Sequence, residues 1–328
     1  LTLARLPQDC DFGIFEIGMN HPGEIRPLVK MVRPHVAIVT LIAAAHLGHF
    51  RNLDEIAQAK AEIFEGIEPG GAALINRDDQ RYKLLAKLAK AQGVKRILGF
   101  GEEARADFRL LDCDLGADSS TIRARIGNTE VEASIGAPGR HMVQNALAVL
   151  GTAQFVGADL GKVAAALAGL EAEQGRGRRH RLALPGGTFT LIDESYNANP
   201  ASMQAAMALL AATPVAEGGR RIAVLGDMLE LGSHSAKLHA ALAEPVKRSG
   251  ADLVLLAGPE MKALADALPE AIARDYRADV GALKPVLLDA VRPGDAVMVK
   301  SSKGIGFSKL VDALIARYPA DVGEQAPA

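Results

Sequence analysis

The residues best suited to chemistry in the first half of the chain are a carboxylate, an imidazole and an amide. Glu16, His46 and Asn76 each lie at or just after a short apolar run. In open parallel sheets, ligands gather at the carboxyl ends of the strands. A carboxylate and an imidazole on neighbouring strand ends can hold a Mg²⁺ ion that bridges phosphates, with water at the remaining positions. Isolated residues of these types at loop starts are more often ordinary surface groups, so the pattern by itself leaves both interpretations open.

Lys60 is the second candidate, because it lies in an alanine-rich stretch with Ala57, Ala59 and Ala61. The ordinary interpretation is a solvated lysine on a helix, with its stem against apolar surface and its charge in water. The alternative is a partly desolvated amine with a lowered pKa that is capable of unusual chemistry. The residues alone do not decide between the two.

Two further segments have the composition of an anion or nucleotide site. Gly139, Arg140 and His141 lead into a helix that carries Gln144 and Asn145. A helix start with a nearby cation suits an anion, and an Asn amide suits the edge of a purine. Farther along, the segment 171–180 carries three arginines, which suit either phosphate binding or a solvated basic linker: Arg176, Arg178 and Arg179.

The most unusual segment is DESYNANP at residues 193–200, which places carboxylates, a hydroxyl, a phenol and two amides on one predicted strand-to-helix turn. A plain turn needs far less polar variety. The segments LGDM at 225–228 and KSSKG at 300–304 also put polar groups at the ends of buried strands. Three such ends on one sheet edge predict a binding face rather than three separate turns.

Strands that alternate with helices must position these groups in the first half of the chain. Apolar runs at 12–17, 36–42, 71–75 and 96–100 predict buried strands, and 78–92 predicts a helix. Asn52 predicts a helix cap, with Glu55 as its capping-box partner. Right-handed βαβ units in one mostly parallel sheet follow from this alternation.

The pattern then changes to an antiparallel hairpin and afterwards to a second α/β unit. Alternating residues at 122–126 and 131–135 flank a Gly-Asn turn. Helices are predicted at 141–156 and 160–170. We expect a central ATPase-type domain over 1–172, a linker over 173–180, a Rossmann-like domain over 181–320 and a flexible tail over 321–328. In the second domain we predict strands at 188–192, 222–225, 253–257 and 296–299, a helix capped by Asn199 with Pro200 at its first position, and a last helix over 308–317.

Size, charge and cysteines limit the class of protein. The chain has 328 residues, about two domains' worth, and nearly half are hydrophobic, so both domains can bury a core. The formal net charge of −2 produces no global field for nucleic acid or an anionic membrane. No apolar run is long enough to span a bilayer, and Cys10 and Cys113 lack metal-site spacing. We expect a cytoplasmic α/β protein that is monomeric, binds no nucleic acid and does not insert into membranes.

Five motifs in combination resemble those of the Mur ligase family, most closely its MurF-type members. They cover nearly the whole chain: FEIGMNHPGEI at 15–25, AAAHL at 43–47, IAQAKAEIF at 56–64, DESYNANP at 193–200 and VLGDMLELG at 224–232. The resemblance implies an ATP- and Mg²⁺-dependent acid–amino-acid ligase of peptidoglycan biosynthesis. Its substrates would be a UDP-muramoyl tripeptide and D-alanyl-D-alanine, which are joined through an acyl phosphate.

The resemblance also implies roles for particular residues. Glu16, His46 and Lys60 would be the catalytic metal-binding groups, with Lys60 carbamylated. Asn76 and Asn145 would lie near the adenine, and Arg176, Arg178 or Arg179 near the phosphates, without a choice among the three. The cofactor side would include Glu194, Ser195, Tyr196, Asn197 and Asn199. The dipeptide side would include Asp227, Lys300, Ser302 and Lys303.

The sequence departs from the family pattern at two places. Glu194 stands where the family usually has Asp, which changes the reach of the carboxylate. The family also binds ATP phosphates on a GKT- or GKS-containing loop. The only Gly-Lys pair of this sequence, Gly161-Lys162, lies within a predicted helix. In the family that loop and a UDP-binding domain precede the Glu16 motif, so we expect an amino-terminally truncated chain that is inactive alone.

Two other functions remain open on the sequence. The first keeps the fold and changes the substrate, as in another Mur ligase or a relative of folylpolyglutamate synthase. The second is a non-catalytic fragment or scaffold. The YNANP segment argues against the first alternative. A dinucleotide oxidoreductase is disfavoured, because no GxGxxG motif follows the first predicted strand.

Overall fold

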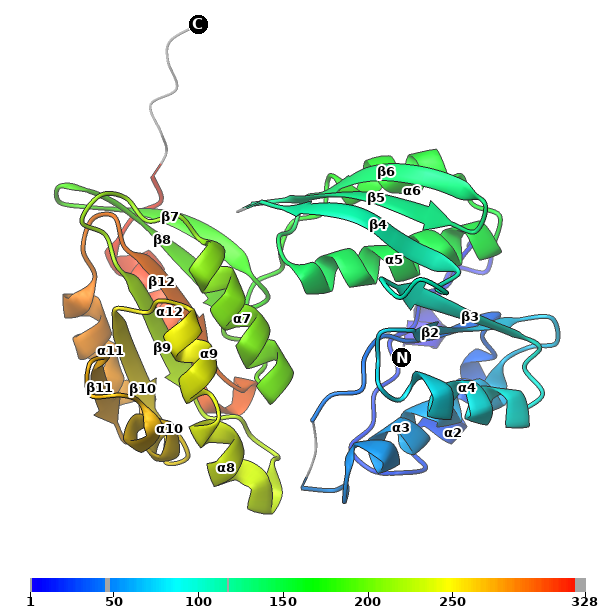
Figure 1. The fold of residues 1–328 in the computed structure, drawn as a ribbon, viewed down its shortest axis with the longest axis horizontal. Helices are drawn as coiled ribbons and strands as arrows, with labels where there is room; N and C mark the ends of the chain where they lie inside the picture. Colours follow the sequence, from blue (N-terminus) through cyan, green and yellow to red (C-terminus); the bar gives the residue numbers. More distant parts are fainter. Residues whose placement is uncertain (1, 45–47, 117, 322–328) are drawn as a thin grey trace, which may run out of the picture.

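The computed structural model describes residues 2–44, 48–116 and 118–321, which form two α/β lobes (Figure 1). Each lobe is built on one six-stranded sheet, and both sheets mix parallel and antiparallel pairing. The predicted fold class is confirmed. Among the described residues, no helix is both long and apolar enough to cross a membrane.

The first sheet has its strands in chain order. The strands are β1 (Val36–Val39), β2 (Ala72–Asn76), β3 (Arg96–Gly101), β4 (Phe108–Leu115), β5 (Ser120–Ile126) and β6 (Thr129–Ile135). Strands β1 to β4 pair in parallel, and β4, β5 and β6 pair antiparallel. The predicted hairpin is therefore present and extends the parallel sheet on one side.

Helices cover both faces of the parallel part of this sheet. Alternate residues of β2 point to opposite sides: Ala73 and Ile75 belong to one core cluster, Ala72 and Leu74 to the other. The first cluster includes residues of α2 (Ile25–Val32), α3 (Leu53–Ala61) and α4 (Tyr82–Ala91). The second includes α5 (Arg140–Phe155) and α6 (Leu160–Leu167). The short elements α1 (Thr2–Arg5) and η1 (Glu62–Gly66) complete the lobe.

The second sheet has the order β11-β10-β9-β12-β8-β7, and only β7 and β8 pair antiparallel. Its strands are β7 (Arg178–Leu184), β8 (Gly187–Glu194), β9 (Arg221–Gly226), β10 (Leu253–Ala257), β11 (Ala273–Arg277) and β12 (Ala296–Lys300). One face is packed by α7 (Pro200–Ala212), α9 (Ala243–Arg248) and α10 (Lys262–Ala267), near α8 (Ser235–Ala240). The other is packed by α11 (Val280–Ala290) and α12 (Ser308–Arg317). The short turns η2 (Gly232–His234) and η3 (Lys303–Ile305) follow β9 and β12.

One predicted strand is wrong. Residues 12–17 form no strand, and Phe12 and Ile14 are 60% and 92% exposed. An apolar run becomes a strand only where a neighbouring strand accepts its hydrogen bonds, and no described residue pairs with this segment. Strands β4, β7 and β11 were not predicted from the sequence. Because β7 begins at Arg178, the last residues of the predicted linker belong to the second sheet.

The predicted caps hold, with one difference. Asn52 accepts the backbone N–H of Glu55 at 3.0 Å, but the Glu55 carboxylate binds Arg51 instead of closing the box. Asn199 caps α7, and here the box is complete: its side chain accepts from Ser202 N while Ser202 Oγ accepts from Asn199 N. The complete box fixes where the DESYNANP turn ends.

Candidate functional site

Lys60 and Glu16 lie close enough to interact in the first lobe. Lys60 is in the last turn of α3 and partly buried, while Glu16 is exposed in the segment that precedes α2. Burial lowers the pKa of the Lys60 amine, and the negative charge of Glu16 partly opposes that shift. Partial burial and this lowered pKa favour the partly desolvated amine over the solvated surface lysine, and the role of Lys60 stays a prediction. His46, the third member of this set, lies outside the described residues.

The two predicted adenine contacts differ in how free their amides are. Asn76 ends β2 and is 6% exposed; its Nδ2 donates to Thr40 O at 2.9 Å and its Oδ1 accepts from Asp78 N at 2.9 Å. Both polar atoms of the Asn76 amide are therefore hydrogen-bonded within the chain, to Thr40 after β1 and to Asp78 after β2. Asn145 lies on α5 with an exposed side chain, so its amide is available to a ligand.

Carboxylates that sequence analysis did not select occupy the start of α5. Glu102 forms an ion pair with Arg140, and Gln144 Nε2 donates to both Asp78 Oδ2 and Glu102 Oε1. Asp78 also accepts the backbone N–H groups of Glu102 and Glu103. The cation at this helix start is therefore neutralised by the protein itself. The only sequence signal was the pair of acidic residues after β3.

The three arginines of the 171–180 segment have different environments. Arg179 points toward α7: its Nη2 donates to Thr213 Oγ1 at 3.1 Å and its Nη1 lies 3.4 Å from Asp118. Burial lowers the pKa of Arg179. Arg176 instead stacks over the ring of Tyr196, with its guanidinium carbon 4.4 Å from the ring centroid. Arg178 is exposed at the start of β7.

Buried hydrogen bonds hold the DESYNANP turn in place. Asp193 is fully buried; one carboxylate oxygen accepts from Ser195 N and Oγ, and the other accepts from Gly175 N at 2.8 Å. Ser195 is therefore occupied inside the turn. Tyr196, at 40% exposure, and Asn197 face outward. The turn thus divides into buried residues that shape it and exposed residues that a ligand can reach.

Residues at the end of β12 form hydrogen bonds to this turn. Lys300 is 1% exposed, and its Nζ donates to Glu194 Oε2 at 3.1 Å and to Asn197 O at 2.9 Å. Ser302 Oγ donates to Ala198 O at 3.3 Å and accepts from Leu229 N at 2.9 Å. Polar groups at the ends of β8, β9 and β12 therefore meet, as their positions in a parallel sheet predict.

Asp227 and Lys303, both predicted on the dipeptide side, lie in opposite environments. Asp227 is 1% exposed, accepts the N–H of Met261 at 2.9 Å, and has a pKa raised by burial. Lys303 is exposed, with its Nζ 5.1 Å from the Tyr196 ring centroid. Arg176 and Lys303 therefore place two cations against one exposed aromatic ring.

The two lobes touch through a backbone hydrogen bond. Gly48 N, in the loop after β1, donates to Glu230 O at 2.8 Å, in the loop after β9. Glu230 has a φ of 63°, an uncommon conformation for a residue with a side chain. Both loops follow the carboxyl ends of parallel strands, so this contact joins the carboxyl-end edges of the two sheets.

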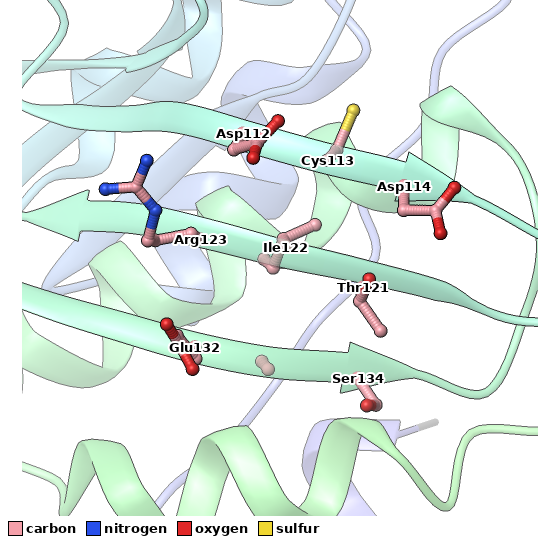
Figure 2. Close-up of a pocket in the computed structure, with 9 residues that line it drawn as sticks. Asp112, Cys113, Asp114, Thr121, Ile122, Arg123, Glu132 and Ser134 are labelled. Carbon is pink, nitrogen blue, oxygen red and sulfur yellow. The ribbon is translucent and has the colours of Figure 1, made fainter.

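A separate pocket of about 400 Å³ lies on the face of β4, β5 and β6 (Figure 2). Asp112, Arg123 and Glu132 are cross-strand neighbours there, so opposite charges alternate across the strands. None of the residues selected from the sequence lines this pocket. Among the described residues no group of three or more His, Cys, Asp or Glu side chains is arranged to hold a metal ion.

Comparison with protein families gives two matches. Residues 1–153 match the Mur ligase middle domain, and residues 175–303 match the Mur ligase glutamate ligase domain. Together the two matches cover most of the chain. The segment between them contains the end of α5, all of α6 and the start of the predicted linker.

Individual relatives carry one recurrent name. The UDP-N-acetylmuramoyl-tripeptide–D-alanyl-D-alanine ligases of Escherichia coli and Rickettsia prowazekii are 35% and 31% identical to this chain. The matches cover 96% and 95% of the chain but 67% and 68% of those relatives, so the chain spans about two thirds of their length. A crystal structure of MurF from Acinetobacter baumannii has a TM-score of 0.85 at 27% identity and covers 96% of the chain and 67% of that protein. A Thermotoga maritima MurF structure in complex with ADP has a TM-score of 0.74 at 25% identity and covers 89% of the chain and 64% of that protein.

Proposed function

Because this chain belongs to the Mur ligase family, we propose that it forms the ATP-handling and amine-binding parts of a peptidoglycan ligase. The ligase joins D-alanyl-D-alanine to UDP-N-acetylmuramoyl-tripeptide. The observation that carries this proposal is the agreement of the E. coli and R. prowazekii relatives, which bear that activity in their names and match almost the entire chain. Another Mur ligase activity is the less favoured alternative.

The proposed reaction has two steps. The terminal carboxylate of the tripeptide attacks the γ-phosphorus of ATP, which gives an acyl phosphate and ADP. The amine of the dipeptide then attacks the acyl carbon, phosphate leaves, and the amine loses a proton. Charge on the transferring phosphoryl group must be offset by fixed cations. Arg176 and Lys303 are exposed at the DESYNANP turn and suit this role.

Lys60 and Glu16 are proposed to hold Mg²⁺ together with His46. The chemistry of the two described groups fits this assignment. Desolvation lowers the pKa of Lys60, so more of the amine is neutral, and a neutral amine can add CO₂ and release a proton to form a carbamate. Glu16 supplies a hard oxygen ligand. The bound ion would neutralise phosphate charge during transfer.

Several predicted contact residues are proposed to shape the site rather than to contact a ligand. Lys300 and Ser302 bond to residues of the DESYNANP turn, and Asp227 bonds to the backbone of Met261. All three are nearly inaccessible to solvent. Lys300 and Ser302 would keep Tyr196 and Asn197 presented at the sheet edge, and Asp227 would fix the loop after β10. Asn145, Arg176, Arg178 and Lys303 then remain, with Tyr196 and Asn197, as the exposed candidates for contact with nucleotide or dipeptide.

The activity is tested in a chimera, because the relatives are longer than this chain. The part of the E. coli ligase that lies outside its match to this chain is joined to the chain, so that the chimera has the full length of that relative. We expect ADP release that requires both UDP-muramoyl tripeptide and D-alanyl-D-alanine, with a matching amide product in mass spectrometry. ADP release that a single amino acid supports equally well would contradict the proposed acceptor.

The matched control separates Lys60 chemistry from the fold. Lys60→Arg keeps the positive charge but cannot form a carbamate at neutral pH, because the guanidinium remains protonated. We expect the chimera with this change to lose activity by about 10²-fold or more. In ¹³C-bicarbonate, the unmodified chain should give a carbamate carbonyl signal that this variant lacks.

A further inference from the structure

The exposed side of α4 carries a group of lysines that the proposed reaction does not use. Lys83, Lys87 and Lys90 are spaced i, i+4 and i+7, so they lie along one side of the helix. Lys95 follows in the loop before β3. All four side chains are exposed, and we call them the α4 basic face.

The α4 basic face is not neutralised by the protein. Residues 80–101 contain no Asp or Glu. No described residue forms an ion pair or a hydrogen bond with the side chains of this face. The arginines of the neighbouring elements differ: Arg26, Arg33, Arg51 and Arg81 each pair with a carboxylate. These four arginines are therefore neutralised within the lobe, whereas the lysines of the α4 basic face are not.

Helix stability does not account for the α4 basic face. Lys90 in the last turn is favourable to the helix dipole, but Lys83 lies in the first turn, where a cation is unfavourable. Like charges at i and i+4 also repel each other, as Lys83 and Lys87 do. Glu at residue 83 would serve the helix better. An anionic partner outside the chain would offset the repulsion among these lysines.

The residue types on this face favour a diffuse anionic surface. Lysine is a compact point charge without the planar fork with which arginine recognises individual phosphates or bases. Of the large hydrophobic side chains that the structure shows exposed, none lies in residues 82–96, so there is no platform for base stacking and nothing to insert into lipid. The apolar side of α4, with Leu85 and Ala89, is buried in the core.

We propose that the α4 basic face binds the anionic surface of a lipid bilayer peripherally, through charge alone. Each lysine held near such a surface adds to binding, and the attraction fades beyond a Debye length. The net charge of −2 does not oppose this, because only the face nearest the membrane is felt at that range. The inference is independent of the ligase activity.

Vesicle sedimentation with the full chain tests the proposal. We expect binding at low salt to vesicles in which about a third of the lipid is phosphatidylglycerol, and none to pure phosphatidylcholine. The triple variant K83E/K87E/K90E should lower the partition coefficient at least about tenfold. Raising the salt to about 0.5 M should release the unmodified chain.

The control variant K237E/K247E/K284E makes the same charge change at exposed lysines of the second lobe. It should alter the partition less than about twofold. Should K83E/K87E/K90E unfold, K83Q/K87Q/K90Q replaces it, with circular dichroism as the check on folding. Equal losses in the two triple variants, or no vesicle binding at low salt, overturn the proposal. Binding to RNA or DNA but not to vesicles, with loss in the α4 variant, also overturns it.

Discussion

At the scale of single residues, burial decides which polar groups are free to act. Lys60, Lys300 and Asp227 are all charged residues near strand ends or in a helix. The sequence alone does not show which of them is buried. The structure separates them: Lys60 is partly buried beside Glu16, whereas Lys300 and Asp227 are sealed inside and hydrogen-bonded. A buried charge is tolerated only when it is paired or can lose its proton.

The lowered pKa of Lys60 predicts a specific pH dependence of stability. The unfolded chain binds the proton more tightly than the folded chain does, so burial of Lys60 costs stability below its folded pKa. That cost disappears as the pH rises toward the ordinary value of 10.5. Lys60→Met should therefore raise the free energy of unfolding at pH 7 and change it less at pH 10. Urea denaturation in CO₂-free buffer measures both values.

The exposed Lys87→Met variant is the control for Lys60, and it should show no comparable pH-dependent gain. A Lys60→Met protein that is less stable than the unmodified chain at both pH values would contradict the prediction. So would a difference that does not change with pH. Either result would mean that packing of the side chain outweighs its desolvation.

The ion pair between Lys300 and Glu194 predicts a coupling between the two residues. Lys300→Met leaves the largely buried carboxylate of Glu194 without its partner, and should cost roughly 3–5 kcal/mol. Adding Glu194→Gln to that variant removes the unpaired charge, so the double variant should be more stable than Lys300→Met alone. Urea denaturation of the four proteins measures the coupling. Strict additivity of the two changes would contradict it.

At the scale of elements, local sequence placed most of the helices and strands correctly. The last helix, Ser308–Arg317, and the strand Leu253–Ala257 have the predicted bounds, because periodicity and flanking turns are local properties. The helix start at Asn199-Pro200 was equally readable. Strand β4, with polar and charged residues in its second half, had no such local signal. Strand β4 forms because it pairs with β3 and β5.

The capping box of α7 predicts a measurable loss of stability. Asn199→Ala removes the acceptor of Ser202 N and half of the reciprocal pair, and should cost about 1 kcal/mol. Gln204→Ala, at an exposed position of the same helix, should stay within about 0.5 kcal/mol of the unmodified chain. Thermal or urea unfolding compares the three proteins. An equal effect of both changes would show that the cap contributes nothing particular.

At the scale of the whole molecule, each sheet has its own pair of core clusters. The first lobe is packed around β2 and α5, the second around β9, β12 and α7. The division between 1–172 and 181–320 stays a prediction; the two pairs of clusters lie on either side of it, and β7 takes part of the predicted linker. Separate cores imply separate cooperative units.

Two core variants test that division by differential scanning calorimetry. Leu147→Ala in the first lobe and Leu310→Ala in the second each empty a fully buried site and should cost about 2–5 kcal/mol. Each should lower one unfolding transition by roughly 5–15 °C and leave the other nearly unchanged. Both variants shifting a single common transition would show that the two lobes unfold as one unit.

The sequence by itself determined the family and the order of most elements, and it predicted the segments of the site, because motifs and hydrophobic periodicity are local properties of the chain. The tertiary structure decided which of those residues are accessible. Residues 12–17 have the composition of a strand but pair with none of the described residues. Lys300 is of a residue type that often contacts ligands, but it is buried and hydrogen-bonded to the turn. Burial and strand pairing depend on residues distant in the chain, so only the folded arrangement could assign them.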